Sequence, residues 1–240
     1  MIWSIQLMAD VVALPQPRSE EENKILTQQA LQGSPEAADH VAGWYLLLMG
    51  NGKLDWATVA AENGSPIGAD NIASILSDGG LLLDSNPYGD YSRDRIWFWL
   101  HRAADHGDEY AIEHVKLEFP EPDKMRLEPE QEIQRWRLSE KTLPQFKRAA
   151  MRGSPDAAYR LYQYHADPKE HLFWARIGAQ NGHPQAPIAL SRLLLKSRES
   201  NDHIRAEFWL KKAIAGGNKE AAKLLQRALQ VDHEENTIKP

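Results

Sequence analysis

The nine histidines are the residues of this 240-residue chain best suited to metal or acid–base chemistry. His101 and His106 stand five residues apart. On a helix this places them about 140° apart, so they cannot share a metal without a third element. His165 and His171 stand six apart across an expected loop. Neither pair has the two-histidine, glutamate arrangement of a helical zinc site, so we expect surface or capping histidines and no metal site.

Other catalytic motifs are equally weak. The sequence GNGK at 50–53 lacks the flanking strand and the longer glycine spacing of a phosphate-binding loop. No serine lies in a G-x-S-x-G elbow, and the chain has no cysteine to act as a nucleophile or thiolate ligand. The sequence therefore predicts no catalytic residue and no cofactor. An enzyme whose site is concealed by repeats stays as a remote alternative.

The pattern that does recur consists of small residues around a glycine. Its anchors are spaced by 31, 43, 46, 29 and 35 residues: Gly33, Gly64, Gly107, Gly153, Gly182 and Gly217. Alanine or glycine stands four residues after each anchor, and small residues precede most anchors by three and four. Tryptophan precedes four anchors by eight, as Trp56, Trp99, Trp174 and Trp209. This agreement indicates an internal repeat.

Each column of the repeat has a physical reason. The positions before the glycine lie on one helical face, where the small residues let a second helix approach. The glycine ends this helix because it takes the left-handed conformation without a Cβ clash. In three units Ser-Pro follows, at 34–35, 65–66 and 154–155. Serine is a natural N-cap and proline suits the first helical position, so a second helix is expected to start there.

The repeat thus predicts six stacked helical hairpins. First helices are expected near 22–32, 54–63, 93–106, 143–152, 168–181 and 203–216. Second helices are expected near 35–48, 66–77, 108–119, 155–165, 184–196 and 219–230. One hairpin cannot bury its own apolar faces, but stacked neighbours can, so the predicted fold is an all-α solenoid.

These columns resemble the Sel-one-like repeat, a relative of the tetratricopeptide repeat. The stretch MGNGKLDWATVAAENG at 49–64 matches that family's whole pattern of glycine-rich turn, aspartate, aromatic residue, small pair and glycine. Later units lose the glycine-rich turn, and the first and fourth lack the tryptophan. The resemblance covers roughly 22–230 and implies a right-handed α-solenoid of about six helix-turn-helix repeats. Members are mostly adaptors and scaffolds; some bacterial ones look like host-interaction factors or like immunity proteins encoded beside toxins, including phospholipase effectors.

Two irregular stretches interrupt the array. Residues 78–92 make a longer link than a hairpin needs, with Leu81, Leu82, Leu83, Tyr88 and Tyr91. Residues 118–132 hold three prolines and six acidic against two basic residues. Proline breaks a helix there, and a short extra helix near 129–140 with Trp136 is expected. The predicted organisation is an N-terminal extension at 1–21, repeats at 22–119, an insertion at 120–141, repeats at 142–230 and a tail at 231–240.

Charge differs between the two halves. Residues 1–141 carry 12 Lys and Arg against 24 Asp and Glu, a net of −12, whereas 142–240 carry 16 against 10, a net of +6. An acidic chain with no single basic stripe is a poor nucleic-acid binder. Either the two halves present electric fields of opposite sign to a partner, or the difference only reflects a gradual change of surface charge along the chain.

The chain as written predicts no membrane span and leaves the compartment open. No apolar run approaches the ~20 residues that cross a bilayer. The apolar start has no basic flank and no cleavage site of a leader. We expect a cytoplasmic protein as written, and a periplasmic one if a leader was removed.

A second aromatic column is the candidate binding surface. Nine residues before the glycine stand Phe98, Phe173 and Phe208. Four residues further on, the same helical face carries Arg102, Ile177 and Lys212, with Arg148 in the fourth unit. First helices usually line the concave side of such solenoids, and aromatic residues and arginine dominate binding hot spots. With Tyr88 and Tyr91 these residues form the predicted partner-binding ridge; the alternative is that the column packs in the core.

The sequence therefore predicts a non-catalytic protein-binding solenoid of bacterial type. The sharper hypothesis is an immunity-type inhibitor that holds one cognate toxin or effector, because opposed charge fields and irregular loops suit one specific partner. The alternative is a regulatory or assembly adaptor that binds several partners. The oligomeric state stays open.

Overall fold

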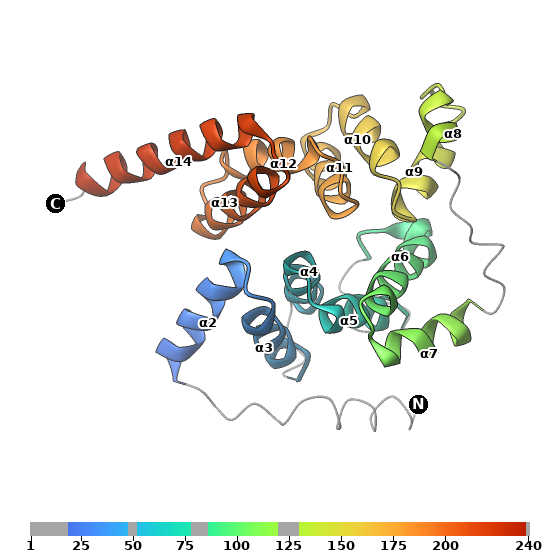
Figure 1. The fold of residues 1–240 in the computed structure, drawn as a ribbon, viewed down its shortest axis with the longest axis horizontal. Helices are drawn as coiled ribbons and strands as arrows, with labels where there is room; N and C mark the ends of the chain where they lie inside the picture. Colours follow the sequence, from blue (N-terminus) through green and yellow to red (C-terminus); the bar gives the residue numbers. More distant parts are fainter. Residues whose placement is uncertain (1–18, 48–51, 78–85, 120–129, 239–240) are drawn as a thin grey trace. The chain divides into compact units, whose positions relative to one another are not determined.

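The computed structural model describes residues 19–47, 52–77, 86–119 and 130–238. In these ranges it holds thirteen α-helices, one short 3-10 helix and no β-strand (Figure 1). The helices pack mainly against their neighbours in the sequence. The all-helical prediction is confirmed, and the sequential packing is consistent with an α-solenoid. Contacts divide the chain into unit 1 (residues 1–87 and 99–118) and unit 2 (residues 88–98 and 119–240).

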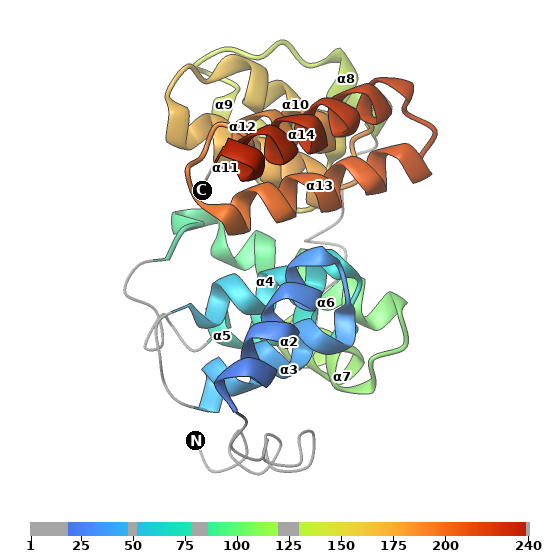
Figure 2. The ribbon, with the colours of Figure 1, turned by 90° about the vertical axis from the view of Figure 1, so that its left-hand side faces the viewer.

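Unit 1 is built from consecutive helical hairpins. Its helices are α2 (Glu20–Gln32), α3 (Pro35–Leu47), α4 (Lys53–Asn63), α5 (Pro66–Ser77), the part of α6 (Ser92–Asp105) from Trp99, and α7 (Glu109–Glu118). The helices α2 to α5 pack side by side in chain order in Figure 1, and Figure 2 views this row from its α2 end. One core cluster consists of Ala30, Ala37, Ala38, Val41 and Ala60. Small side chains at these contacts let the helices approach closely.

Unit 2 repeats the same construction. Its elements are η1 (Gly89–Tyr91), the first turns of α6, α8 (Glu130–Arg135), α9 (Leu143–Met151), α10 (Pro155–Tyr164), α11 (Pro168–Gln180), α12 (Ala186–Leu194), α13 (Ser200–Ala215) and α14 (Lys219–Ile238). From α9 onward each helix packs against the next. In Figure 1, α11 and α13 lie on one side of this unit, and α12 and α14 on the other. Trp174 and Trp209 are buried between the helices, as the repeat predicts.

The repeat glycines end helices or turns in the predicted conformation. All six have a positive φ, between 85° and 115°. After three of them a serine caps the next helix: the Oγ atoms of Ser34, Ser65 and Ser154 accept backbone N–H groups at 3.1, 2.9 and 3.1 Å. Proline then occupies the first helical position of α3, α5 and α10. The predicted hairpin turn is confirmed.

The helix boundaries depart from prediction in two places. The extra helix α8 has six residues and ends at Arg135, so Trp136 follows it instead of lying on it. Arg160 donates to the carbonyl oxygens of Ile133 (3.0 Å) and Trp136 (2.5 Å). These bonds satisfy carbonyl groups at the end of α8, so the helix can end there. The last helix, α14, continues to Ile238, eight residues past its expected end, because no glycine or proline intervenes before Pro240.

Several predicted features lie outside the described residues. These are the leucines of the first irregular link, residues 120–129 of the predicted insertion and residues 1–18 of the N-terminal extension.

Candidate protein-binding surface

The structure divides the predicted ridge between packed and exposed positions. Tyr88, Ile177 and Phe208 are buried. Tyr91, Phe98, Arg102 and Phe173 are half-buried. Arg148 and Lys212 are exposed. The aromatic column therefore contributes mainly to packing, and the cationic positions of unit 2 reach the surface.

Some ridge residues meet one another, and others do not share a unit. The rings of Tyr88 and Phe173 lie 6.1 Å apart, and the Lys212 ammonium lies 5.2 Å from the ring centre of Phe208. Phe98 belongs to unit 2, whereas Arg102 belongs to unit 1. The Arg102 guanidinium lies 5.6 Å from the ring of Trp99. Burial lowers the pKa of Arg102, and the carboxylate of Glu62 opposes this shift.

Two of the phenylalanines meet an arginine that precedes them. The guanidinium of Arg95 lies 4.0 Å from the ring centre of Phe98, and that of Arg205 lies 3.9 Å from the ring centre of Phe208. Both arginines are buried and stand three residues before the phenylalanine. Sequence reasoning sought the cation four residues after the ring and missed this pair. The signal was present as R-x-x-F at 95–98 and 205–208.

Arg95 also ties together two repeats of unit 2. Its Nη1 donates to Asn181 Oδ1 at 3.0 Å, and its Nη2 donates to Gln180 Oε1 at 2.5 Å. Asn181 in turn donates through Nδ2 to the carbonyls of Ala150 (2.7 Å) and Ser154 (3.0 Å), at the preceding hairpin turn. A guanidinium with this many partners is a positioning group of the fold and is not available to a ligand.

The same asparagine contact occurs in unit 1. Asn63 Nδ2 donates to the carbonyls of Ala30 (2.7 Å) and Ser34 (3.1 Å). An asparagine directly before the repeat glycine therefore satisfies the exposed carbonyls of the preceding turn. Sequence reasoning missed this role, although Asn-Gly at 63–64 and 181–182 was visible.

Cations gather on the first helices of unit 2, and we call this group the cationic stripe. It occupies the sixth and fifth positions before the repeat glycine: Lys147 and Arg148 on α9, Arg176 on α11, and Lys211 and Lys212 on α13. The Lys147 ammonium lies 6.0 Å from the ring of Trp174, which joins α9 to α11. Ala175 on α11 and Trp209 on α13 share one core cluster. These cations are far apart in the sequence and occupy equivalent positions of successive first helices.

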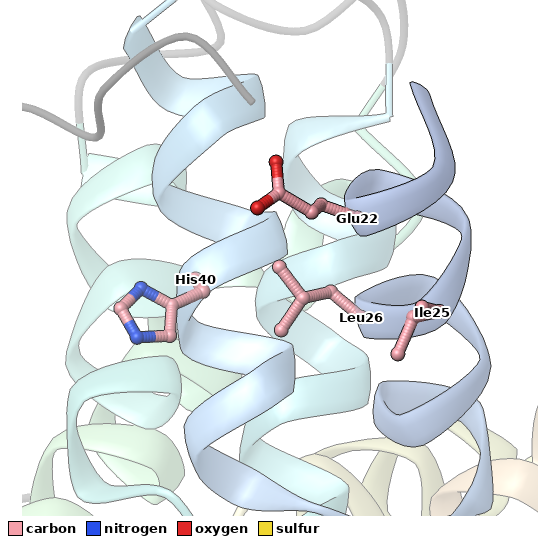
Figure 3. A pocket seen from close by; sticks show the side chains of 4 residues that line it. All are labelled: Glu22, Ile25, Leu26 and His40. Atoms are coloured by element: carbon pink, nitrogen blue, oxygen red, sulfur yellow. The ribbon is translucent and has the colours of Figure 1, made fainter. Parts of the chain in front are cut away.

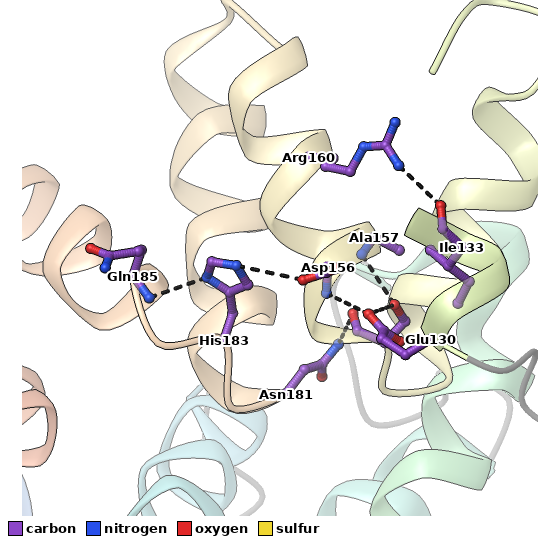
Figure 4. Close-up of polar contacts among 9 residues, drawn as sticks. Glu130, Ile133, Asp156, Ala157, Arg160, Asn181, His183 and Gln185 are labelled. Atoms are coloured by element: carbon purple, nitrogen blue, oxygen red, sulfur yellow. Dashed lines mark hydrogen bonds and ion pairs between the residues drawn. The ribbon is translucent and has the colours of Figure 1, made fainter. Parts of the chain in front are cut away.

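Contacts between rings connect the second helix α10 to the neighbouring hairpin. The ring of Tyr159 lies 4.0 Å from that of His183 and 5.4 Å from that of Tyr162, which lies 4.3 Å from His171. Figure 4 shows His183 between Gln185, whose N–H donates to Nδ1 at 3.2 Å, and Asp156, 3.7 Å from Nε2. Burial lowers the pKa of His183, and the Asp156 carboxylate opposes the shift.

A hollow of about 290 Å³ lies beside α2 and α3 (Figure 3). It is lined by Glu22, Ile25, Leu26 and His40. The Glu22 carboxylate accepts the N–H and O–H of Ser19 at 2.8 and 2.9 Å, as part of the cap of α2. The carboxylate that lines this hollow is therefore already part of a helix cap.

Among the described residues, no three side chains of His, Cys, Asp or Glu are grouped so that they could hold a metal ion. In the same part of the chain no helix has the length and low polarity that crossing a bilayer requires. Neither a family model nor a curated protein matches this chain.

Proposed function

We propose that the chain is a Sel-one-like repeat protein, a right-handed solenoid of six helical hairpins that binds one protein partner and catalyses no reaction. The glycine turns, Ser-Pro caps and buried tryptophans support this family assignment, because each occupies the position that the repeat pattern requires. Stacked hairpins present long surfaces built from equivalent positions, a design suited to binding another protein.

One observation carries the binding function: Arg148 and Lys212 stand exposed at the same repeat position of two first helices. Arginine at a protein surface beside aromatic packing is typical of a binding hot spot. In unit 2 the exposed cations of the ridge contact the partner in this proposal. The buried side chains of Phe208 and Ile177 pack the helices that carry these cations.

The specific role that we propose is immunity: the protein holds a cognate secreted toxin or effector, such as a phospholipase, in an inactive complex. The net charges of −12 and +6 on the two halves favour a single partner with a complementary pattern of charge. Such a complex is expected to contain one copy of each protein and to weaken as salt rises.

The test is isolation of the partner from the native host, with the wild-type chain as bait and identification by mass. We expect one protein, encoded beside this chain, whose toxicity in a growth assay is relieved by co-expression. The double variant Arg148→Glu, Lys212→Glu should raise the dissociation constant about tenfold or more, which corresponds to roughly 1.4 kcal/mol or more of binding free energy. Unchanged helical content by circular dichroism is the control for folding. Several weakly bound proteins and no toxin would instead favour an adaptor.

A further inference from the structure

We infer that Asn181 is a hydrolytic modification site: deamidation of its side chain breaks a hydrogen-bonded bridge between two successive hairpins of unit 2 and makes the loss permanent. The reactive sequence is Asn-Gly at 181–182, in which the glycine has no side chain to hinder ring closure. Water is the only co-reactant. The inference is independent of the proposed function, because it concerns a contact that holds repeats together.

The side-chain amide of Asn181 uses both of its ends. Its Nδ2 donates to the carbonyl oxygens of Ala150 (2.7 Å) and Ser154 (3.0 Å), on either side of the preceding repeat glycine. Its Oδ1 accepts an N–H of Arg95 at 3.0 Å. In Figure 4 the side chain of Asn181 points toward the start of α10. The amide therefore bridges Arg95 and the preceding hairpin turn, and we call these three bonds the Asn181 bridge.

The donor half of this bridge recurs in unit 1. Asn63 is also followed by a glycine, and its Nδ2 donates to the carbonyls of Ala30 and Ser34. In both units the acceptors are the third residue before the repeat glycine and the first residue after it. The repeat thus uses asparagine at this position as a donor to two carbonyls.

Deamidation of Asn181 proceeds through a cyclic imide. The backbone nitrogen of Gly182 loses its proton and bonds to the Asn181 Cγ. Nδ2 takes up a proton, the Cγ–Nδ2 bond breaks, and ammonia leaves. Water then adds to one of the two carbonyl carbons of the ring, and the C–N bond of that carbon breaks. Opening at Cγ gives aspartate, and opening at the backbone carbonyl gives isoaspartate, without any change of oxidation state.

The folded turn delays this reaction. Asn181 has a helical φ of −78° and ψ of −5°, and the Gly182 N–H donates to the carbonyl of Ala179 at 3.2 Å. Ring closure requires this N–H to be released and the backbone of Asn181 to rotate. Gly182 is exposed and Asn181 is half-buried, so water reaches the turn. We therefore expect deamidation from the locally opened turn, at a rate set by how often the turn opens.

The product carboxylate cannot restore the Asn181 bridge. A carboxylate accepts hydrogen bonds and donates none, so it repels the carbonyl oxygens of Ala150 and Ser154. It stays attracted to the guanidinium of Arg95, because a hydrogen bond between charged groups is stronger than one to an amide. The modified side chain therefore keeps Arg95 and releases the turn. In isoaspartate the additional backbone carbon also lengthens the turn.

Peptide mapping by mass spectrometry tests the modification on the full chain. The wild-type protein is incubated in mildly alkaline buffer with and without urea, and aspartate and isoaspartate at position 181 are followed over time. We expect deamidation to be slower by about tenfold or more in the folded chain than in urea. Asn218 is the sequence control: it precedes Lys219, whose side chain hinders ring closure, so it should react much more slowly in urea. Equal rates at Asn181 in buffer and in urea, or no reaction in urea, would overturn the inference.

The variant Asn181→Asp tests the loss of the bridge, because it carries the product side chain from the start. It should lower the melting temperature by about 3 °C or more, since two carbonyl groups lose their donor. Hydrogen exchange should accelerate in α10 and α11, and unchanged exchange in α2 to α5 shows that the variant folds.

Asn218→Asp is the matched control for the same chemical change. The Asn218 Oδ1 accepts the N–H groups of Glu220 (3.0 Å) and Ala221 (3.3 Å) at the start of α14, a role that aspartate fills equally well. Its melting temperature should differ from wild type by less than about 1 °C. If Asn181→Asp melts and exchanges like the wild type, the amide does not hold the hairpins together and the inference is wrong.

Discussion

Single glycines set the bends of this chain, and they do so for different local reasons. Gly107 has a φ of +85°, and a Cβ added there would meet no atom within 4 Å. Backbone conformation alone therefore selects glycine at this position. At Gly153 the φ is +113° and an added Cβ would lie 2.8 Å from Phe98, so conformation and packing act together.

Replacing Gly107 by alanine should lower the free energy of unfolding by about 1–2 kcal/mol, because an L-residue is strained in the left-handed region. The matched control is Gly43→Ala inside α3, where an added Cβ also meets nothing within 4 Å. A helix-interior alanine is favoured over glycine by about 0.5–1 kcal/mol, so this variant should become more stable. Thermal unfolding followed by circular dichroism measures both, and shifts of the same sign would contradict the turn assignment.

At the scale of helices, contacts between hairpins depend on polar and aromatic side chains as well as on apolar packing. His183 follows α11 and stacks on Tyr159 of α10, so an imidazole joins two successive repeats. Its Nδ1 accepts the N–H of Gln185, an arrangement that only the neutral ring can make. Protonation therefore weakens the contact between these hairpins.

The stability of unit 2 should depend on pH through this histidine. Because burial lowers the pKa of His183, the unfolded chain binds more protons in the window below about pH 6.5. The contribution to stability is complete above that pH and is lost as the pH falls. His183→Gln should thus reduce the loss of melting temperature between pH 7.5 and pH 5.

His114 is the control of opposite sign, since a hydrogen bond to Asp70 raises its pKa. Its contribution is present below about pH 6.5 and is lost as the pH rises through the folded value. His114→Gln should therefore lower stability most at acid pH. Identical pH profiles of the wild type and His183→Gln would show that the stacked ring does not titrate as proposed.

At the scale of the whole molecule, contacts between successive helices suggest that stability is approximately a sum over neighbouring hairpins. From α9 to α14 each helix packs against the next along the chain. Within one such contact, Leu210 packs with Ile188, Ala213 and Ala221. Damage at this contact is expected to spread to the adjoining hairpins only.

Leu210→Ala should destabilise the last hairpins by about 2–5 kcal/mol, because it leaves a cavity at a fully buried site. Hydrogen exchange measured by mass spectrometry should then accelerate in α12, α13 and α14, with little change in α2 to α5. Leu210→Met keeps the volume and should cost less than about 1.5 kcal/mol. Uniform acceleration along the chain would instead indicate a single cooperative unit.

The sequence by itself determined the helices and their turns. Gly33 and Ser34 act within one turn of the backbone, and the tryptophan column marks the buried face by its period, so local physics was sufficient. Only the tertiary structure decided which side chains share a surface. Arg95 reaches Asn181, and Lys147 approaches Trp174, across stretches of chain that local periodicity does not relate. Such contacts depend on how successive hairpins stack, and the period of the sequence does not specify this stacking.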